Sequence, residues 1–166
     1  MMSYDTVIEP IFLQGDFCVN KDFELTEFIL PNRINHIQKQ GFPFFNGMVT
    51  IQGKITTNTD IVKLYLTGNY ATAELYVNNK KKGVVALSEE VKISNLKQGE
   101  NSVKILVKST MRNMYGPHHC KGMQEDWGAC PYMFTFFKQW KNGQPGDFIK
   151  EYNLASFGID RIEIED

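Results

Sequence analysis

The chain has 166 residues, with 18 lysines and arginines against 19 acidic residues and a formal net charge of -1. This length fits one domain, residues 1–166, which can bury roughly two-thirds of its unfolded surface without disulfides or a structural metal. The near balance of charge excludes the broad basic field that draws proteins to nucleic acid or anionic membranes. We therefore expect neither nucleic acid nor membrane among its partners.

The N-terminus and the cysteines bear on the cellular compartment. The opening "MMSYDTVIEP" has neither a basic start nor an apolar run, so it does not resemble a signal peptide. Cys18, Cys120 and Cys130 leave at least one thiol unpaired, and their spacing matches no zinc or CxxC motif. We expect a cytoplasmic protein if the chain is complete, although a fragment of a longer secreted protein would look the same.

Alternation of apolar and polar residues predicts a series of short strands. The clearest is 71–79, "ATAELYVNN", in which every second side chain is apolar. The other expected strands are 11–19, 48–56, 61–67, 89–93, 101–109, 132–140 and 159–165. Strands this short, separated by turns rich in Gly, Asn and Lys, indicate an all-β antiparallel sandwich or barrel.

Two segments depart from the alternating pattern. Residues 23–40, "FELTEFILPNRINHIQKQ", are compatible with a short helix or an irregular excursion that ends near Gly41. The aromatic run "GFPFF" places Phe42, Phe44 and Phe45 directly before a strand. We expect these rings to seal one end of the sandwich as part of the core.

The turns that flank the central strands have recognisable chemistry. Gly99 permits a positive φ angle, and Asn101 can satisfy backbone groups at the same turn. The hairpin after residue 77 has Asn79 and a run of three lysines where Asn-Gly is common. This substitution argues against a tight two-residue turn at that hairpin.

The run from Leu64 to Ser109 resembles the sugar-binding jelly roll of family 2 glycoside hydrolases and related galactose-binding-like domains. The shared pattern is an apolar strand, then "AELYVNNKKKG", a strand pair, and "LKQGENSVKILV". The resemblance implies a strand, hairpin and strand in which Gly-Glu-Asn turns the chain into the next core strand. It also implies a galactose-binding-like jelly roll.

Blocks on both sides extend this resemblance. "FLQGDFCV", "KQGFPFFNGMVTIQGKI" and "STMRNMYGPHH" look like the C-terminal β-sandwich domain of bacterial proteins grouped with glycosyl hydrolases, including α-L-rhamnosidase-like ones. From the jelly-roll order we expect the strand near Ile162 and Ile164 to return beside the N-terminal strand, residues 12–19. The two termini would then lie close together.

The stretch "MRNMYGPHHC", residues 111–120, has the richest side-chain chemistry. Arg112 and Asn113 follow a strand directly, so they should emerge at an end of the sandwich, where binding loops gather. In a structural interpretation Arg112 pairs with a carboxylate, Asn113 caps a turn, and His118 and His119 bond backbone carbonyls. In a binding interpretation the same four residues contact a sugar.

Metal binding has less support in this stretch. His118 and His119 are adjacent, and adjacent side chains in extended chain diverge to opposite faces, so both seldom bind one ion. The resemblance to galactose-binding-like jelly rolls, which often carry a structural calcium held by loop oxygens, implies calcium as a candidate ligand. Asp16, Asp147 and Asp160 are scattered oxygen donors, and we assign no metal site and no other cofactor.

The segment "CKGMQEDWGACPY" adds an aromatic platform to these polar groups. Trp127 stands with Glu125 and Asp126 on the same expected loop as the two histidines. Sugars offer apolar faces and rings of hydroxyls, so an aromatic ring with Arg, Asn and His forms a plausible carbohydrate site. The alternative for Trp127 is a plug in the core or between domains.

No catalytic constellation stands out. Glycoside hydrolysis needs two carboxyl groups at a set separation, but any chain with this many acidic residues offers pairs. No P-loop, dinucleotide fingerprint or nucleophile elbow is present. We expect a non-catalytic carbohydrate-binding or accessory domain of a glycoside hydrolase. The alternative is a structural domain that docks a neighbouring catalytic domain and binds no free sugar.

Overall fold

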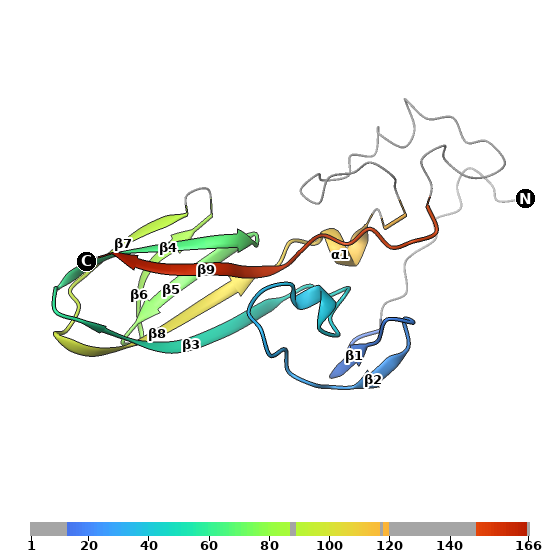
Figure 1. Cartoon of the computed structure of the whole chain (residues 1–166), viewed down its shortest axis with the longest axis horizontal. Coiled ribbons are helices and arrows are strands. Elements are labelled where there is room, and N and C mark those ends of the chain that lie inside the picture. The colour runs from blue at the N-terminus through green and yellow to red at the C-terminus, as the bar shows by residue number, and fades with distance from the viewer. Residues whose placement is uncertain (1–12, 87–88, 117, 120–148, 166) are drawn as a thin grey trace, which may run out of the picture.

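The computed structural model describes residues 13–86, 89–116, 118–119 and 149–165, and these residues are mostly strands (Figure 1). The strands are β1 (Phe17–Val19), β2 (Leu25–Glu27), β3 (Met48–Thr57), β4 (Ile61–Asn69), β5 (Thr72–Val77), β6 (Lys80–Val85), β7 (Glu90–Ser94), β8 (Gly99–Lys108) and β9 (Gly158–Glu165). The short helices are the 3-10 turn η1 (Ile37–Lys39) and α1 (Arg112–Tyr115). None of the helices in these ranges is long and apolar enough to cross a membrane.

Two antiparallel sheets form the sandwich. One has the strand order β3-β8-β5-β6 and the other the order β7-β4-β9, while β1 and β2 pair separately. The all-β antiparallel sandwich predicted from the alternating pattern is therefore confirmed. The jelly-roll connectivity stays a prediction.

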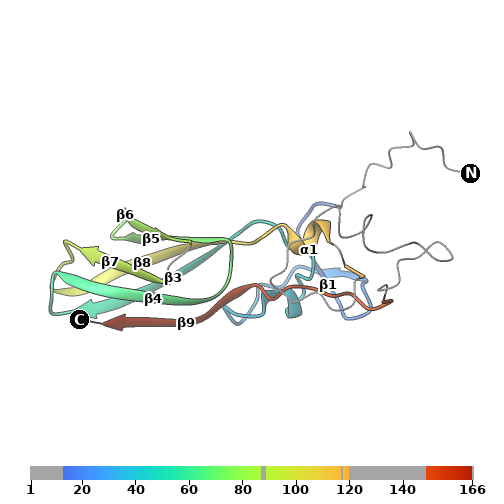
Figure 2. The same cartoon turned by 90° about the horizontal axis from the view of Figure 1, so that it is seen from above.

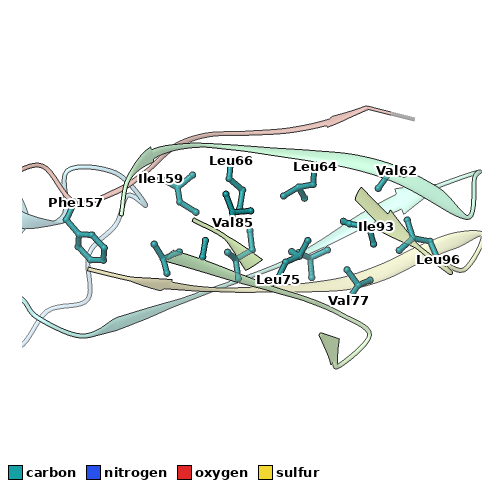
Figure 3. Packing of buried hydrophobic residues seen from close by; sticks show 14 of the residues in the cluster. Val62, Leu64, Leu66, Leu75, Val77, Val85, Ile93, Leu96, Phe157 and Ile159 are labelled. Carbon is teal, nitrogen blue, oxygen red and sulfur yellow. The ribbon is translucent and has the colours of Figure 1, made fainter. Parts of the chain in front are cut away.

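The core lies between the two sheets (Figure 3). Alternate residues of β4 and β5 point inward, as the sequence pattern predicted; Leu66 and Leu75 are wholly buried. Phe42 and Phe45 pack against this core, and Phe45 stacks on Phe157 with ring centroids 5.6 Å apart. The sealing role predicted for Phe42 and Phe45 is thus confirmed.

The hairpin between β5 and β6 corrects one expectation. Val77 pairs with Lys80, so only Asn78 and Asn79 form the turn, and it is a tight two-residue turn. Both asparagines have positive φ angles, 50° and 61°, as a type I′ turn requires. The expectation was wrong because asparagine tolerates the left-handed region almost as glycine does. The Asn78 side chain also accepts a hydrogen bond from Ser102 N at 3.0 Å.

The turn into β8 follows the prediction. Gly99 has a φ angle of 93°. Asn101, which is wholly buried, donates to the carbonyl oxygens of Lys97 and Gly99 and accepts from Lys97 N. The predicted roles of Gly99 and Asn101 are therefore confirmed.

The expected pairing of the first and last strands is wrong. Among the described strands, β9 pairs with β4, and β1 pairs with β2. Figure 1 shows β1 at one end of the molecule and the end of β9 at the other. The reason is that Ile162 and Ile164 find their apolar neighbours in Leu66 and Leu64 on β4, whereas β1 is only three residues long.

Residues 23–40 are largely irregular. Their regular structure is β2 and the short turn η1, at Ile37–Lys39. The segment is tied to the strand β9 by backbone hydrogen bonds from Ile37 N to Phe157 O and from Ile159 N to Ile34 O. This connection holds the β1–β2 region at the end of the sandwich where β9 begins (Figure 1).

Candidate functional site

The segment with the richest chemistry follows β8 directly. Ser109 ends that strand by donating its backbone N–H to Gly47 O, and Gly47 N donates to the Ser109 hydroxyl at 2.9 Å. The chain then forms the single turn of α1 and runs beside residues 149–157, which lead into β9 (Figure 2). The predicted position at an end of the sandwich is confirmed.

Asn113 is held inside the protein and not on its surface. Its side chain is 5% exposed. Its Nδ2 donates to Ala155 O at 2.8 Å, and its Oδ1 accepts from Ala155 N at 2.7 Å. The Asn113 amide thus bonds both backbone groups of Ala155, as a neighbouring strand would in a sheet. Buried backbone groups need such partners, because an unsatisfied one costs stability.

Arg112 and His118 also bond to backbone oxygens. The Nη2 atom of Arg112 donates to Asn153 O at 3.2 Å. The Nε2 atom of His118 lies 2.7 Å from Asn113 O; since a carbonyl oxygen only accepts, this nitrogen must carry the proton. The backbone of the two histidines joins the same region, because Asn153 N donates to His118 O and Ile149 N to His119 O.

Tyr152 is the centre of a group of aromatic rings at this end of the molecule. Its ring centroid lies 4.3 Å from that of Phe23, 5.3 Å from Phe44, 5.7 Å from His118 and 4.5 Å from His119. Phe23 and Tyr152 are 46% and 39% exposed. The five residues, called the Tyr152 cluster below, present aromatic surface beside histidine nitrogens.

The structure brings four of the five predicted binding residues to one segment. Arg112, Asn113, His118 and His119 all contact residues 149–157 through the bonds and rings just given. Trp127, with its acidic neighbours Glu125 and Asp126, lies outside the described residues.

Tyr152, Asn153 and Ala155 were missed at the sequence level. Asn113 and Ala155 are 42 positions apart, and the only local signal was the polar, irregular composition of "KEYNLAS" before a strand.

The described residues contain no cluster of potential metal ligands. No group of three or more His, Cys, Asp or Glu residues gathers in the ranges that the structure describes. Asp16 precedes β1 and Asp160 lies in β9, while Asp147 lies outside those ranges. A structural calcium therefore stays a prediction without assigned ligands. Cys18 is a buried free thiol, and Cys120 and Cys130 are outside the described residues.

A second polar group lies on the outer face of the larger sheet, far from α1. Glu74 accepts a hydrogen bond from Tyr76 at 2.8 Å and forms an ion pair with Lys81 at 2.9 Å. The bonds from Lys81 and then Tyr76 lower the pKa of the Glu74 carboxyl, and the Glu74 bond raises the pKa of Lys81. The ammonium of Lys104 lies 4.8 Å from the centre of the Tyr76 ring. This group is an exposed ion-pair network on the sheet.

The chain matches no family model and no curated protein sequence. Among solved structures it is similar to a rhamnosidase from Novosphingobium sp. PP1Y, with 20% sequence identity and a TM-score of 0.47 over 60% of this chain. The matched part is 10% of the rhamnosidase chain. Similarity at this level carries no argument about activity.

Proposed function

We propose that the chain is a non-catalytic accessory domain of a glycoside hydrolase, and that the α1 region fixes the end of the sandwich that docks the catalytic domain. The resemblance of residues 64–109 to sugar-binding jelly rolls supports the link to glycoside hydrolases. The observation that carries the docking role is the set of bonds from Arg112, Asn113 and His118 to backbone oxygens of this chain. Arg112 and Asn113 thereby hold residues 153–155 in place, and His118 binds the carbonyl oxygen of Asn113, which is a structural task.

The surface beside this region suits an apolar contact. Ile29 and Leu30 are 68% and 74% exposed, and Leu25 and Phe28 add further exposed apolar surface. They lie in and after β2, at the same end of the sandwich as α1 (Figure 1). Exposed apolar patches mark sites of protein contact more often than single exposed apolar residues do. We assign them to the contact with the catalytic domain.

Docking is tested with the catalytic domain of the same glycoside hydrolase, produced separately and titrated with this chain in a calorimeter. The wild type should bind, and Ile29→Lys with Leu30→Lys should weaken binding at least about tenfold, because a buried charge would replace apolar contact. Val84→Lys is the matched control, since Val84 is 48% exposed on β6. Equal weakening by Val84→Lys, or no binding by the wild type, refutes the docking role.

Carbohydrate binding is the second candidate, and the Tyr152 cluster favours it. Its half-exposed rings offer a surface on which a sugar ring can stack, and the histidines beside them supply hydrogen-bonding nitrogens. Titration with a panel of monosaccharides and oligosaccharides, rhamnose and galactose included, tests it. Tyr152→Ala should abolish the binding heat, while Tyr65→Ala on β4 should leave it unchanged. A panel without any binding heat for the wild type removes this candidate.

The proposed absence of catalysis has its own assay. The purified chain should not hydrolyse chromogenic rhamnosides, galactosides or glucosides above background. Turnover that disappears when one specific carboxylate is replaced would show that the accessory role is wrong.

A further inference from the structure

One edge of β9 has no partner among the described strands and is a candidate for strand pairing. β9 pairs with β4 along one edge, and none of the other described strands lies along the second edge. In Figure 2 it is the outermost strand on its side of the sandwich. A strand edge of eight residues presents a row of backbone N–H and C=O groups that can accept another extended chain.

The side chains of β9 alternate between an apolar face and a charged face. Ile162 and Ile164 lie opposite Leu66 and Leu64, which are buried in the core, yet they are 37% and 41% exposed themselves. Both isoleucines face inward, and none of the described residues covers them along the unpaired edge of β9. Arg161, Glu163 and Glu165 alternate with these isoleucines along the strand and lie on the other face of the sheet.

We propose that β9 pairs with β9 of a second copy of this chain, in antiparallel orientation about a two-fold axis, to give a continuous six-stranded sheet β7-β4-β9-β9-β4-β7. Residues directly opposite in an antiparallel pair point to the same face. The apolar face of one copy must therefore meet the apolar face of the other, which excludes registers shifted by one residue.

Charge complementarity selects the second copy as the occupant. With the axis at Ile162, Arg161 lies opposite Glu163 of the second copy, and this pair occurs twice by symmetry. With the axis at Glu163, Arg161 lies opposite Glu165 of the second copy, but Glu163 then faces Glu163 of the second copy, and like-charge repulsion disfavours this register. With the axis at Ile164, Glu163 would face Glu165 instead, which like-charge repulsion disfavours. Charge therefore favours the register centred on Ile162, in which Arg161 meets a glutamate twice and no like charges lie opposite each other.

The same pairing covers Ile162 with apolar surface. In this register Ile162 lies opposite Ile162 of the second copy, so the apolar row of one sheet continues into the next. The irregularity at Thr67 and Gly68 of β4, opposite Ile159 and Arg161, limits the regular part of the edge to residues 161–165. A short ladder of this kind predicts a weak dimer, whose population depends on protein concentration.

The test uses two charge-reversed variants and sedimentation equilibrium over a range of concentrations. Variant one is Arg161→Glu, and variant two combines Glu163→Arg with Glu165→Arg. Each variant carries three like charges on the edge, so its self-association should weaken at least about tenfold. The side chains of Arg161, Glu163 and Glu165 are 69%, 48% and 63% exposed, so these changes leave the core untouched, which circular dichroism verifies.

Mixing the two variants gives the decisive result. One edge is then acidic and the other basic, so the mixture should form a heterodimer at least as readily as the wild type forms a dimer. Lys92→Glu, on the opposite edge strand β7 of the same sheet, is the control and should dimerise like the wild type. A wild type that stays monomeric at every concentration, variants that dimerise unchanged, or a mixture that does not associate would each overturn the proposal.

Discussion

Replacing Asn113 by alanine is the sharpest perturbation of the α1 region. The substitution removes two hydrogen bonds, of 2.8 and 2.7 Å, and leaves both backbone groups of Ala155 without the side chain that pairs with them. Each buried group left without a partner costs about 1 to 3 kcal/mol, so we expect a loss of about 2 to 5 kcal/mol in the free energy of unfolding. For a domain of this size that corresponds to a decrease of roughly 4 to 20 °C in Tm.

Urea denaturation followed by circular dichroism measures this loss directly. Asn46→Ala is the matched control, because Asn46 is exposed and its side chain, among the described residues, bonds the sulfur of Met114; its effect should stay within about 0.5 kcal/mol. Asn113→Asp separates the two bonds, since a carboxylate still accepts from Ala155 N but faces Ala155 O without a proton to donate. A loss below about 0.5 kcal/mol for Asn113→Ala would refute the structural role of this side chain.

Three further predictions concern the rest of the fold. Asn101→Ala, at a wholly buried side chain that bonds Lys97 and Gly99, should cost about 3 to 5 kcal/mol in urea denaturation; an effect under 1 kcal/mol contradicts it. Gly158→Ala should cost at least about 2 kcal/mol, because Gly158 has a φ angle of 132° and a Cβ there meets the backbone of Ile34; Gly53→Ala, with open space around it, should be nearly neutral. The lowered pKa of Glu74 means that its contribution to stability is present above the ordinary glutamate pKa and is lost as pH falls through the folded-state pKa; NMR titration of the Glu74 carboxyl should show a midpoint below that of a free glutamate, and an ordinary midpoint would refute it.

Local signals in the sequence predicted much of the sandwich, but they did not predict its edges. Period-two alternation predicted strands that the structure contains as β3, β4, β5, β7, β8 and β9. The tight hairpin at Asn78 and Asn79 was missed because the Asn-Gly rule understates what asparagine can adopt. The partner of β9 was mispredicted because alternation shows which face of a strand is buried, and says nothing about which strand lies beside it.

The candidate site shows the same division between sequence and tertiary structure. The sequence by itself identified Arg112, Asn113, His118 and His119 as a group rich in hydrogen-bonding chemistry, because their residue types and their position after a strand are local properties. Only the tertiary structure decided the partners of these residues. Arg112 and Asn113 bond the backbone of Asn153 and Ala155, and His118 bonds the backbone of Asn113. The ring of Tyr152 contacts both histidine rings. The bonds of Arg112 and Asn113 join residues 41 and 42 positions apart. Their pairing depends on how the two sheets pack, since no periodicity in the chain encodes which distant backbone groups need a partner.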